Sequence, residues 1–369
     1  MGITEDRPRP PRSRLGSFTK WRNGLVSDPK FQKWAAKFPL TKRIARKDGE
    51  KLFDLVAGFV YSQTLFACVE LNLFEKLMDQ PKTAASLAFS CEIPPERMET
   101  LCKSACSLGL LNLRKDDRYE VARLGAALLG VPGLQQMIRH HDILYRDMRD
   151  PLALLRGEKE TELANFWPYV LGQTEAAQPE IVETYSDLMA KSQALVAEET
   201  LQTVPPDGKG IWMDVGGGTG AFLKALKTHT PTQKVLLFDL PDVVKDVKDL
   251  PKQWGSFLDP LPPADTISLV RVLYDHNNET VRALLARIFE ALPENGRLVI
   301  SEPMSGGSQP IKATDSYFAF YTMAMRTGQV RSQAEISELL KRAGFGNIKA
   351  HRPNRAYVTS VLTSVKPSV

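Results

Sequence analysis

The apolar residues of this chain follow two different patterns, and the first gives way to the second near residue 209. Between residues 50 and 130 they recur at helical spacing, most clearly over 52–74. Polar residues such as Asp54 and Glu70 interrupt that window, which favours a packed helix over a membrane span. Two short strands about an Asp-Asp turn at 116–117 follow, and helices that end in a small hairpin are typical of a winged-helix domain.

From residue 209 onward, near-continuous apolar strands alternate with helices. This alternation predicts a parallel sheet with helices on both faces, because a strand that is covered on both sides is apolar throughout. Two final strands, 347–352 and 356–365, follow one another without a helix and are expected to be antiparallel. The predicted fold is therefore α/β, a doubly wound sheet with an antiparallel C-terminal edge hairpin, preceded by a helical winged-helix domain. The parallel strands are expected at 210–215, 234–240, 265–273 and 296–303, and the helices at 221–227, 241–249, 278–292, 311–327 and 332–343.

The boundaries of these regions divide the chain into four parts. We expect a basic N-terminal arm at 1–47, a winged-helix-like domain at 48–131, a helical linker at 132–205 and the sheet domain at 206–369. A chain of 369 residues is long enough for two cores of this kind. Its composition, 43% hydrophobic and 25% charged, is that of an ordinary globular protein.

Positive charge is concentrated in the arm. Residues 1–47 contain thirteen Lys and Arg against three acids, whereas the whole chain carries a net charge of only +5, so the rest is acidic. One interpretation is a partly disordered solubilising tail, and the other is attachment to an anionic surface, either membrane or nucleic acid. Trp21, Trp34, Phe31 and Phe38 favour a membrane interface over a pure charge contact.

A winged helix raises the alternative of a DNA-binding regulator. The expected recognition helix, 94–109, contains Arg97 and Lys103 but also Glu96 and Glu99, which makes a poor surface for phosphates. We therefore expect packing or dimerisation there and no nucleic-acid partner.

Cysteine and histidine residues give little sign of a metal site. All four cysteines lie within residues 68–106 without a CxxC pair, which predicts reduced, packed thiols in a cytoplasmic protein. The His140–His141 pair precedes Asp142, and we expect it on a surface helix face rather than in a metal site.

The first strand of the sheet runs into a glycine-rich loop, "DVGGGTG" at 214–220. Gly216, Gly218 and Gly220 let the backbone turn sharply and approach a ligand closely. Asp239 ends the next strand, where a carboxylate can accept both hydroxyls of a ribose. The spacing also fits a dinucleotide loop, but Asp214 can take a positively charged amino group, and with the terminal hairpin this favours S-adenosylmethionine as the cofactor.

Together these motifs resemble the small-molecule O-methyltransferases of the caffeic-acid and hydroxyindole type over about residues 50–365. The resemblance is carried by "DVGGGTG", "FDLPDVV", "FLDPLPPADTISLVRVLYD", "ALPENGRLVISEP" and "SQAEISELLKRAGF". A closer resemblance, to the acyclic carotenoid O-methyltransferases of phototrophic bacteria, is carried by "LFDLVAGFVYSQTL", "RVLYDHN", "SEPMSGG" and "DSYFAFYTMAMRTGQVRS". It implies a class I methyltransferase sheet behind a winged-helix dimerisation domain, and hence a homodimer.

The resemblance also implies roles for individual residues. Gly216, Asp239 and Leu240 would hold the cofactor, and Phe257 would pack on its adenine, although Ser256 stands where many relatives carry an acid. Arg271 matches a basic residue before the catalytic position, with an ion pair at the sheet edge as the alternative. Two residues on a long linking helix match positions that touch the cofactor from above, Tyr185 and Met189.

The catalytic position departs from the family pattern. Relatives have a His followed by Asp, whereas this chain has Tyr274 and Asp275, with His276 next. Glu302 matches the acid that orients or assists the base. A neutral Tyr is a poor proton acceptor and a His is a good one, so chemistry favours His276 and alignment favours Tyr274. We expect His276 to accept the proton and Tyr274 to position the substrate.

The segment 315–328 is rich in aromatic and Met residues, which suit a flat, elongated ligand. Phe318, Tyr321 and Met325 are the candidate substrate contacts, with an ordinary core helix as the alternative. The resemblance implies methylation of the tertiary hydroxyl of an acyclic carotenoid; another large apolar ligand, a chlorin or polyketide phenol, is the rival. A non-catalytic winged-helix regulator is the rival of a different class. We expect a cytoplasmic protein that lies peripherally on the inner face of the photosynthetic membrane.

Overall fold

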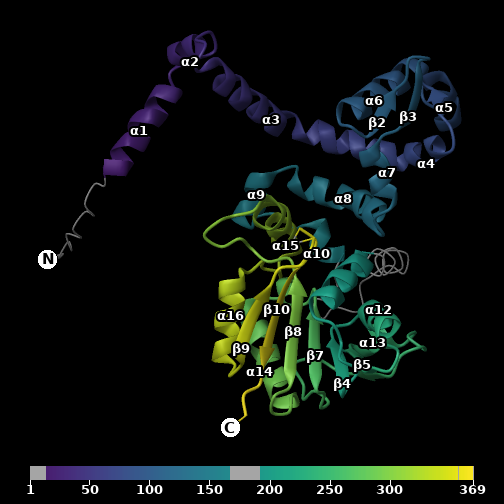
Figure 1. Cartoon of the computed structure of the whole chain (residues 1–369), viewed down its shortest axis with the longest axis vertical. Helices are drawn as coiled ribbons and strands as arrows, with labels where there is room; N and C mark the ends of the chain where they lie inside the picture. The colour runs from purple at the N-terminus through teal and green to yellow at the C-terminus, as the bar shows by residue number, and fades with distance from the viewer. Residues whose placement is uncertain (1–13, 167–191, 356, 369) are drawn as a thin grey trace.

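The computed structural model describes residues 14–166, 192–355 and 357–368 (Figure 1). Its N-terminal part is helical: α1 (Arg14–Val26), α2 (Pro29–Ala35) and the long α3 (Lys42–Glu70). Asp28 begins α2 by accepting a hydrogen bond from the Lys30 amide, and Pro29 occupies the first turn, where its missing N–H costs nothing. The described part of the arm is therefore not a disordered tail, and α3 runs through the predicted arm boundary at residue 47.

A small domain surrounds the C-terminal half of α3. It contains α4 (Leu73–Met78), β1 (Lys82–Thr83), α5 (Ala84–Cys91), α6 (Pro95–Ser107), β2 (Leu111–Leu113), β3 (Arg118–Val121) and α7 (Arg123–Leu129). The three strands form a sheet in the order β1-β3-β2, which confirms the predicted hairpin. Cys68 and Cys102 are buried in its core beside Phe74 and Met98, and burial raises the pKa of both thiols to about 12. They are packed thiols, as predicted.

Helices connect the two domains and cover the top of the sheet. α8 (Leu134–Met148) and α9 (Pro151–Arg156) precede α10 (Glu162–Phe166), and residues 192–203 form a further helix. The prediction that His140 and His141 lie on a surface face is wrong, because α8 packs against α15 (Ala319–Met325). His140 bonds to Tyr321 of α15, and His141 bonds to Tyr317 in the turn just before that helix. An amphipathic pattern shows that a face is polar, but not that the polar face is exposed.

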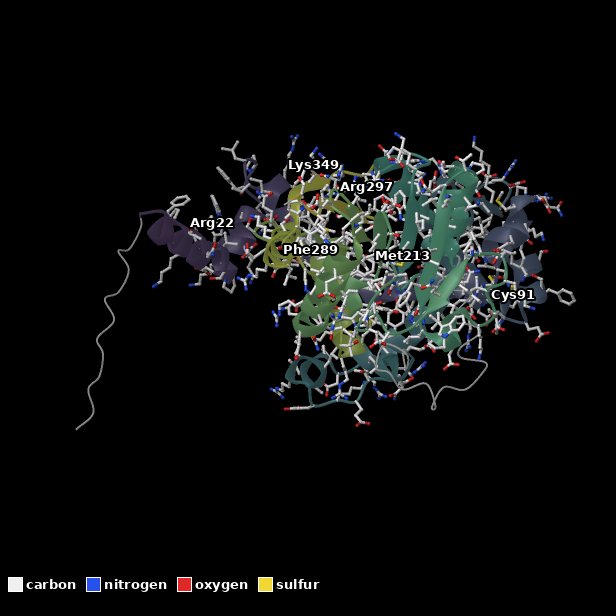
Figure 2. All side chains as sticks on the ribbon, turned by 90° about the horizontal axis from the view of Figure 1, so that it is seen from below. Arg22, Cys91, Met213, Phe289, Arg297 and Lys349 are labelled. Carbon is white, nitrogen blue, oxygen red and sulfur yellow. The ribbon has the colours of Figure 1, made fainter. Side chains whose placement is uncertain are left out.

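The C-terminal domain is built on a seven-stranded sheet in the order β6-β5-β4-β7-β8-β10-β9. Its first five strands are parallel, and β10 enters antiparallel to β8, which confirms the predicted fold class. Met213 lies at its centre, well away from Arg22 on the arm and Cys91 in the small domain (Figure 2). The strands are β4 (Ile211–Val215), β5 (Lys234–Asp239), β6 (Lys252–Trp254), β7 (Thr266–Val270), β8 (Arg297–Glu302), β9 (Gly346–His351) and β10 (Ser360–Val365).

Two separate clusters of apolar side chains cover the two faces of this sheet. α14 (Asn278–Ala291) and α16 (Gln333–Arg342) pack on one face. α12 (Ala221–His229), α13 (Pro241–Val244) and the helix 192–203 pack on the other. The helix predicted over 241–249 is only four residues long. β6 was not predicted, because three mostly exposed residues are too few to show an alternating apolar pattern.

Candidate active site

The carboxyl ends of the parallel strands converge below α10 and α15 (Figure 1). In an open α/β sheet, ligands bind at this edge, where the strand order reverses. Here the reversal falls between β4 and β7, and Asp214 and Asp239 stand at or near the ends of the adjacent strands β4 and β5. The loop 271–276 follows β7 directly, so three of the predicted site segments meet at one place.

Asp214 is a buried carboxylate with one oxygen unsatisfied. Ser268 donates its hydroxyl to Oδ1 at 2.6 Å, whereas Oδ2 has no hydrogen-bond partner among the described residues. Burial raises the pKa of Asp214 to about 7, with the Ser268 bond acting in the opposite direction. A buried acceptor that lacks a donor is costly, and a cationic ligand at Oδ2 would relieve that cost.

The glycine loop leaves room for such a ligand. A Cβ on Gly217 would lie 2.6 Å from Oδ2 of Asp214, so a side chain there would block the unsatisfied oxygen. Gly216 has a φ of 69° and its missing Cβ would meet Val272 at 3.0 Å. Gly218, with a φ of 59°, donates its amide to Asp239. Both Gly216 and Gly218 use a conformation that other residues adopt only with strain.

Asp239 anchors the loop and retains capacity for a ligand. Its Oδ2 accepts from the Gly218 amide at 2.8 Å and its Oδ1 from the Leu240 amide at 2.7 Å. Burial raises the pKa of Asp239, while the two amide bonds lower it. Each carboxylate oxygen has two lone-pair sites, so a pair of hydroxyls can still be accepted.

The loop after β7 is strained and tightly held. Arg271 adopts a φ of 61°, unusual for a side chain with a Cβ, and such strain clusters at functional sites. Its guanidinium lies 3.3 Å from the hydroxyl oxygen of Tyr274 and donates to the Ser192 hydroxyl at 2.9 Å. Tyr274 is buried within η1 (Leu273–Asp275), and burial raises its pKa, so its hydroxyl stays protonated.

Two buried residues, Glu302 and Arg331, hold the backbone of the loop 271–276 by hydrogen bonds. Glu302 accepts from the Tyr274 amide through Oε2, and its Oε1 is buried without a partner among the described residues. Arg331 is 1% exposed and donates to the carbonyl oxygens of Leu273 and His276. Burial raises the pKa of Glu302 to about 7, although the Arg331 charge acts to lower it. The pKa of the neighbouring Asp275 rises to about 8 for the same reason.

Tyr274 and His276 face different surroundings. The Tyr274 ring stands edge-on to Phe318, with centroids 6.5 Å apart. The His276 ring stands edge-on to Phe257, with centroids 5.1 Å apart. Burial and the Arg331 charge lower the pKa of His276 to about 4, so its imidazole is neutral.

The aromatic segment over the site begins with a π-helical turn, η2 (Ala313–Phe318), and continues as α15. Single π turns inside helices occur frequently at functional sites. Phe318 is half-buried and contacts Tyr274, whereas Tyr321 and Met325 are buried among the side chains of α8 and α10. Tyr321 bonds to His140 at 2.8 Å and Tyr317 bonds to His141 at 2.7 Å.

The structure therefore brings most of the predicted site residues together. Asp214, Gly216, Gly218, Asp239, Leu240, Phe257, Arg271, Tyr274, Asp275, His276, Glu302 and Phe318 lie along one edge of the sheet. Tyr185 and Met189 lie outside the described residues. Sequence reasoning missed Arg331, Gly217 and the two His–Tyr pairs. The sequence offers only weak signals for them: an Arg just after the aromatic segment, and two adjacent His residues.

Comparison with known proteins identifies the family. Residues 145–346 match the family model of the O-methyltransferase domain, and residues 53–130 match that of the O-methyltransferase dimerisation domain. The chain belongs to the O-methyltransferase family. Demethylspheroidene O-methyltransferase of Cereibacter sphaeroides is 48% identical over 98% of both chains, and that of Rhodobacter capsulatus is 45% identical over 88% of this chain and 84% of its own.

Solved structures agree on the fold. The calicheamicin biosynthesis methyltransferase CalO1, solved with S-adenosylhomocysteine, has a TM-score of 0.74 at 22% identity, over 87% of this chain and 98% of its own. Human N-acetylserotonin methyltransferase in complex with S-adenosylmethionine has a TM-score of 0.67 at 23% identity, with the same coverage. As an O-methyltransferase, the chain depends on S-adenosylmethionine. The unsatisfied oxygen of Asp214 beside Gly217 fits the ammonium group of that cofactor, and Asp239 fits its ribose.

Proposed function

We propose that this O-methyltransferase methylates the tertiary hydroxyl of an acyclic carotenoid. The observation that carries the proposal is the near-full-length identity to two demethylspheroidene O-methyltransferases, at 48% and 45%. The relatives named for tricetin in Triticum aestivum and for acetylserotonin in Mus musculus are much more distant, at 24% and 28% identity. The loop after β7 supports the same distinction, because it carries Tyr274 where the resemblance places a catalytic His.

Four residues are proposed to hold the cofactor. The Asp214 carboxylate would accept the ammonium group, and Asp239 would accept the ribose hydroxyls. Phe257 would pack on the adenine, and the His276 ring beside it would complete that wall. When bound, the cofactor supplies a methyl group on a positively charged sulfur, which makes the methyl carbon electrophilic.

Catalysis then depends mainly on alignment. A tertiary alcohol is a very weak acid, so no side chain ionises it before methyl transfer begins. Holding its oxygen in line with the methyl carbon contributes most, because well-oriented reactants avoid the entropic cost of meeting. The Tyr274 hydroxyl, fixed by Arg271 at 3.3 Å, is proposed to orient the substrate oxygen. Phe318 is proposed to contact the polyene beside it.

The matched dimerisation domain supports a homodimer. Among the described residues, one helix, α3, is long and apolar enough to cross a membrane, by length and composition only. Only 17% of its most apolar window is buried. Its C-terminal end lies in the core of the small domain, while a stripe along its middle is exposed. We propose that a second copy covers this α3 stripe, defined by Leu52, Leu55, Val56 and Phe59.

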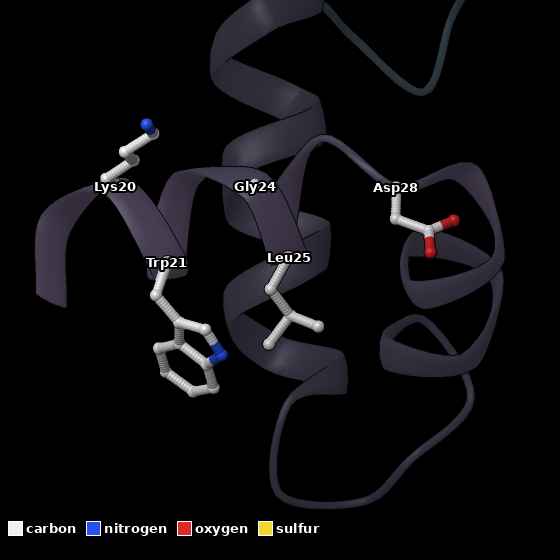
Figure 3. A pocket seen from close by; sticks show the side chains of 5 residues that line it. All are labelled: Lys20, Trp21, Gly24, Leu25 and Asp28. Atoms are coloured by element: carbon white, nitrogen blue, oxygen red, sulfur yellow. The ribbon is translucent and has the colours of Figure 1, made fainter. Parts of the chain in front are cut away.

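The arm is proposed to contact an anionic membrane surface and so to bring the enzyme to an apolar substrate. Trp21 lines a hollow on the arm together with Lys20, Gly24, Leu25 and Asp28 (Figure 3). Trp21 is 63% exposed and Trp34 is 50% exposed. Exposed indoles beside lysines are typical of segments that lie in the interface of a bilayer.

The test of the proposed function is a comparison of substrates. Purified enzyme with S-adenosylmethionine should methylate an acyclic carotenoid that bears a tertiary hydroxyl, and should leave the same polyene without that hydroxyl unchanged. A phenolic acid, an indole alcohol and a hydroxylated chlorin serve as rival acceptors. A kcat/KM for any rival that exceeds that for the hydroxylated carotenoid would overturn the proposal.

A further inference from the structure

Two histidines of α8 are bonded to two tyrosines of the segment that covers the site. His141 Nε2 lies 2.7 Å from the Tyr317 hydroxyl oxygen, and His140 Nε2 lies 2.8 Å from that of Tyr321. Neither pair belongs to the cofactor site, and neither follows from a sequence motif. Both distances are those of good hydrogen bonds, so each pair is a ready path for one proton.

Of the two pairs, Tyr317–His141 is the more exposed. Tyr321 is 6% exposed and His140 is 8% exposed, whereas Tyr317 and His141 are both half-buried. The Tyr317 ring also stands edge-on to Phe318 at 4.9 Å, and Phe318 contacts Tyr274. Tyr317 is thus one aromatic ring away from the residue at the catalytic position.

The charges around Tyr317 also connect it to the loop that carries Tyr274. Burial raises the pKa of Tyr317, and the nearby Arg271 charge lowers it while Tyr274 and Tyr145 raise it. Arg271 is the residue that holds the Tyr274 hydroxyl, so one guanidinium acts on both tyrosines. The Tyr317 hydroxyl has a second, weaker acceptor in Met137 Sδ, at 3.7 Å.

We infer that Tyr317 is a catalytic residue that takes the substrate proton, and that His141 is the positioning residue that takes the proton of Tyr317 in turn. This inference rests on the proposed O-methylation of an alcohol. The substrate O–H bond breaks and its proton moves to the Tyr317 oxygen, while the Tyr317 proton moves to Nε2 of His141. The substrate oxygen keeps the electron pair, and the proton that the reaction releases ends on the imidazole.

A weak base is sufficient for this step. Burial lowers the pKa of His141, so the ring is neutral and able to accept a proton at neutral pH. As the bond from oxygen to the methyl carbon forms, the bond from that carbon to sulfur breaks and its electron pair goes to sulfur. The substrate oxygen becomes positively charged, so its proton becomes strongly acidic. The partial exposure of His141 then lets the proton return to water.

His276 is less suited to this role than the Tyr317–His141 pair. Its ring packs on Phe257, the proposed adenine contact, and not on the aromatic segment. Its backbone carbonyl is fixed by Arg331 at 2.7 Å, which fixes the course of the chain at that point. If Tyr317 and His141 take the proton, their variants should lose more activity than His276→Asn. If His276 takes the proton, the order should be reversed.

The first test is kinetic and uses carotenoid acceptor and S-adenosylmethionine with the full-length protein. Tyr317→Phe and His141→Gln should each lower kcat about 10²-fold or more, with cofactor affinity by calorimetry and KM nearly unchanged. Gln keeps an acceptor close to the position of Nε2 but cannot take a proton. Full activity of His141→Gln would show that the bond is only structural and would overturn the inference.

Two further variants serve as comparisons. His351 forms an equivalent bond to Thr363 at 2.8 Å on β9 and β10, so His351→Gln measures the general effect of losing such a bond. Tyr321→Phe removes the hydroxyl of the other pair and should cost much less than Tyr317→Phe. An equal loss in Tyr321→Phe, or a much larger loss in His276→Asn, would contradict the assignment.

The second test needs no turnover and so separates this inference from the proposed function. In protein labelled with ¹⁵N-histidine, His141→Gln identifies the His141 resonances among those of five histidines. Nε2 of His141 should be unprotonated at neutral pH, and Tyr317→Phe should shift its resonance. A proton on Nε2 would mean that His141 donates to Tyr317, which excludes the relay even if the enzyme methylates carotenoids. Wild-type enzyme that is inactive on carotenoids would instead overturn the proposed function alone.

Discussion

The residue with the sharpest electrostatic consequence is Asp214, because one oxygen is paired with Ser268 and the other is buried without a partner among the described residues. Sequence alone predicts a cofactor-binding role for Asp214, since its position before the glycine loop is a local feature. Sequence could not reveal that Gly217 keeps its second oxygen open, because that contact depends on how the loop folds back over the strand.

Asp214→Asn should therefore have opposite effects on binding and on stability. Loss of a charged hydrogen-bond acceptor should weaken S-adenosylmethionine binding by about 1.5–3 kcal/mol, measured by calorimetry. Without cofactor, the variant should gain stability relative to wild type as the pH rises. The folded-state pKa of about 7 lies above the ordinary 3.8. Wild type therefore loses stability as the pH rises between those values, because the carboxyl ionises in the unfolded chain but not in the fold, whereas Asn cannot ionise.

The control for this variant is Asp242→Asn, which changes an exposed carboxylate on α13. Asp242→Asn should alter neither cofactor affinity nor the pH dependence of the unfolding midpoint. Equal pH dependence in wild type and Asp214→Asn would show that Asp214 is not held in the buried, uncompensated state described above.

At the scale of elements, the loop 271–276 depends on Arg331 from a distant segment. Arg331 donates to two carbonyl oxygens of this loop and to Asn278, and its charge faces Glu302. The strands, the glycine loop and α14 were predictable from the sequence because their signals are local periodicities. The hydrogen bonds of Arg331 and the His–Tyr pairs were not predictable, because they join segments more than 50 residues apart in the sequence.

Arg331→Met should destabilise the enzyme by about 3–5 kcal/mol, because it leaves Glu302 buried without its cation and the carbonyl oxygens without a donor. Urea unfolding measures this loss. Arg342→Met is the matched control, since the Arg342 side chain is 68% exposed and its ion pair with Glu338 contributes less than about 1 kcal/mol. Similar losses for both variants would mean that Arg331 does not hold the loop.

The arm is a second element whose boundary the structure corrects. Because α3 begins at Lys42, a deletion of residues 1–47 would cut into it, and residues 1–40 are the better deletion. Without its nine Lys and Arg, each worth up to about 1 kcal/mol at an anionic surface, binding to anionic liposomes should be lost. Cosedimentation at low and high salt measures this, with calorimetry of cofactor binding as the control. Undiminished binding of the shortened protein would exclude the arm as the membrane contact.

At the scale of the whole molecule, the α3 stripe is proposed to be covered by a second copy. Its four residues expose more than half of their surface, and Phe59 alone is 68% exposed. A charge at its centre, Phe59→Glu, should convert the dimer to monomer in analytical ultracentrifugation, because an unpaired charge cannot be buried in an apolar interface. Lys47→Glu, which changes an exposed residue on another face of the same helix, should remain dimeric. A Phe59→Glu protein that sediments like wild type would place the dimer interface elsewhere.

The overall reaction is tested most directly by the position of the transferred methyl group. Purified enzyme is incubated with S-adenosylmethionine that carries a deuterated methyl group and with an acyclic carotenoid that has one tertiary hydroxyl, and the product is fragmented in a mass spectrometer. We predict a single deuterated methyl group on the tertiary oxygen, recovered in the fragment that contains the end group. Label on carbon, or no label in the carotenoid while a phenolic acceptor in the same mixture is methylated, would contradict the account.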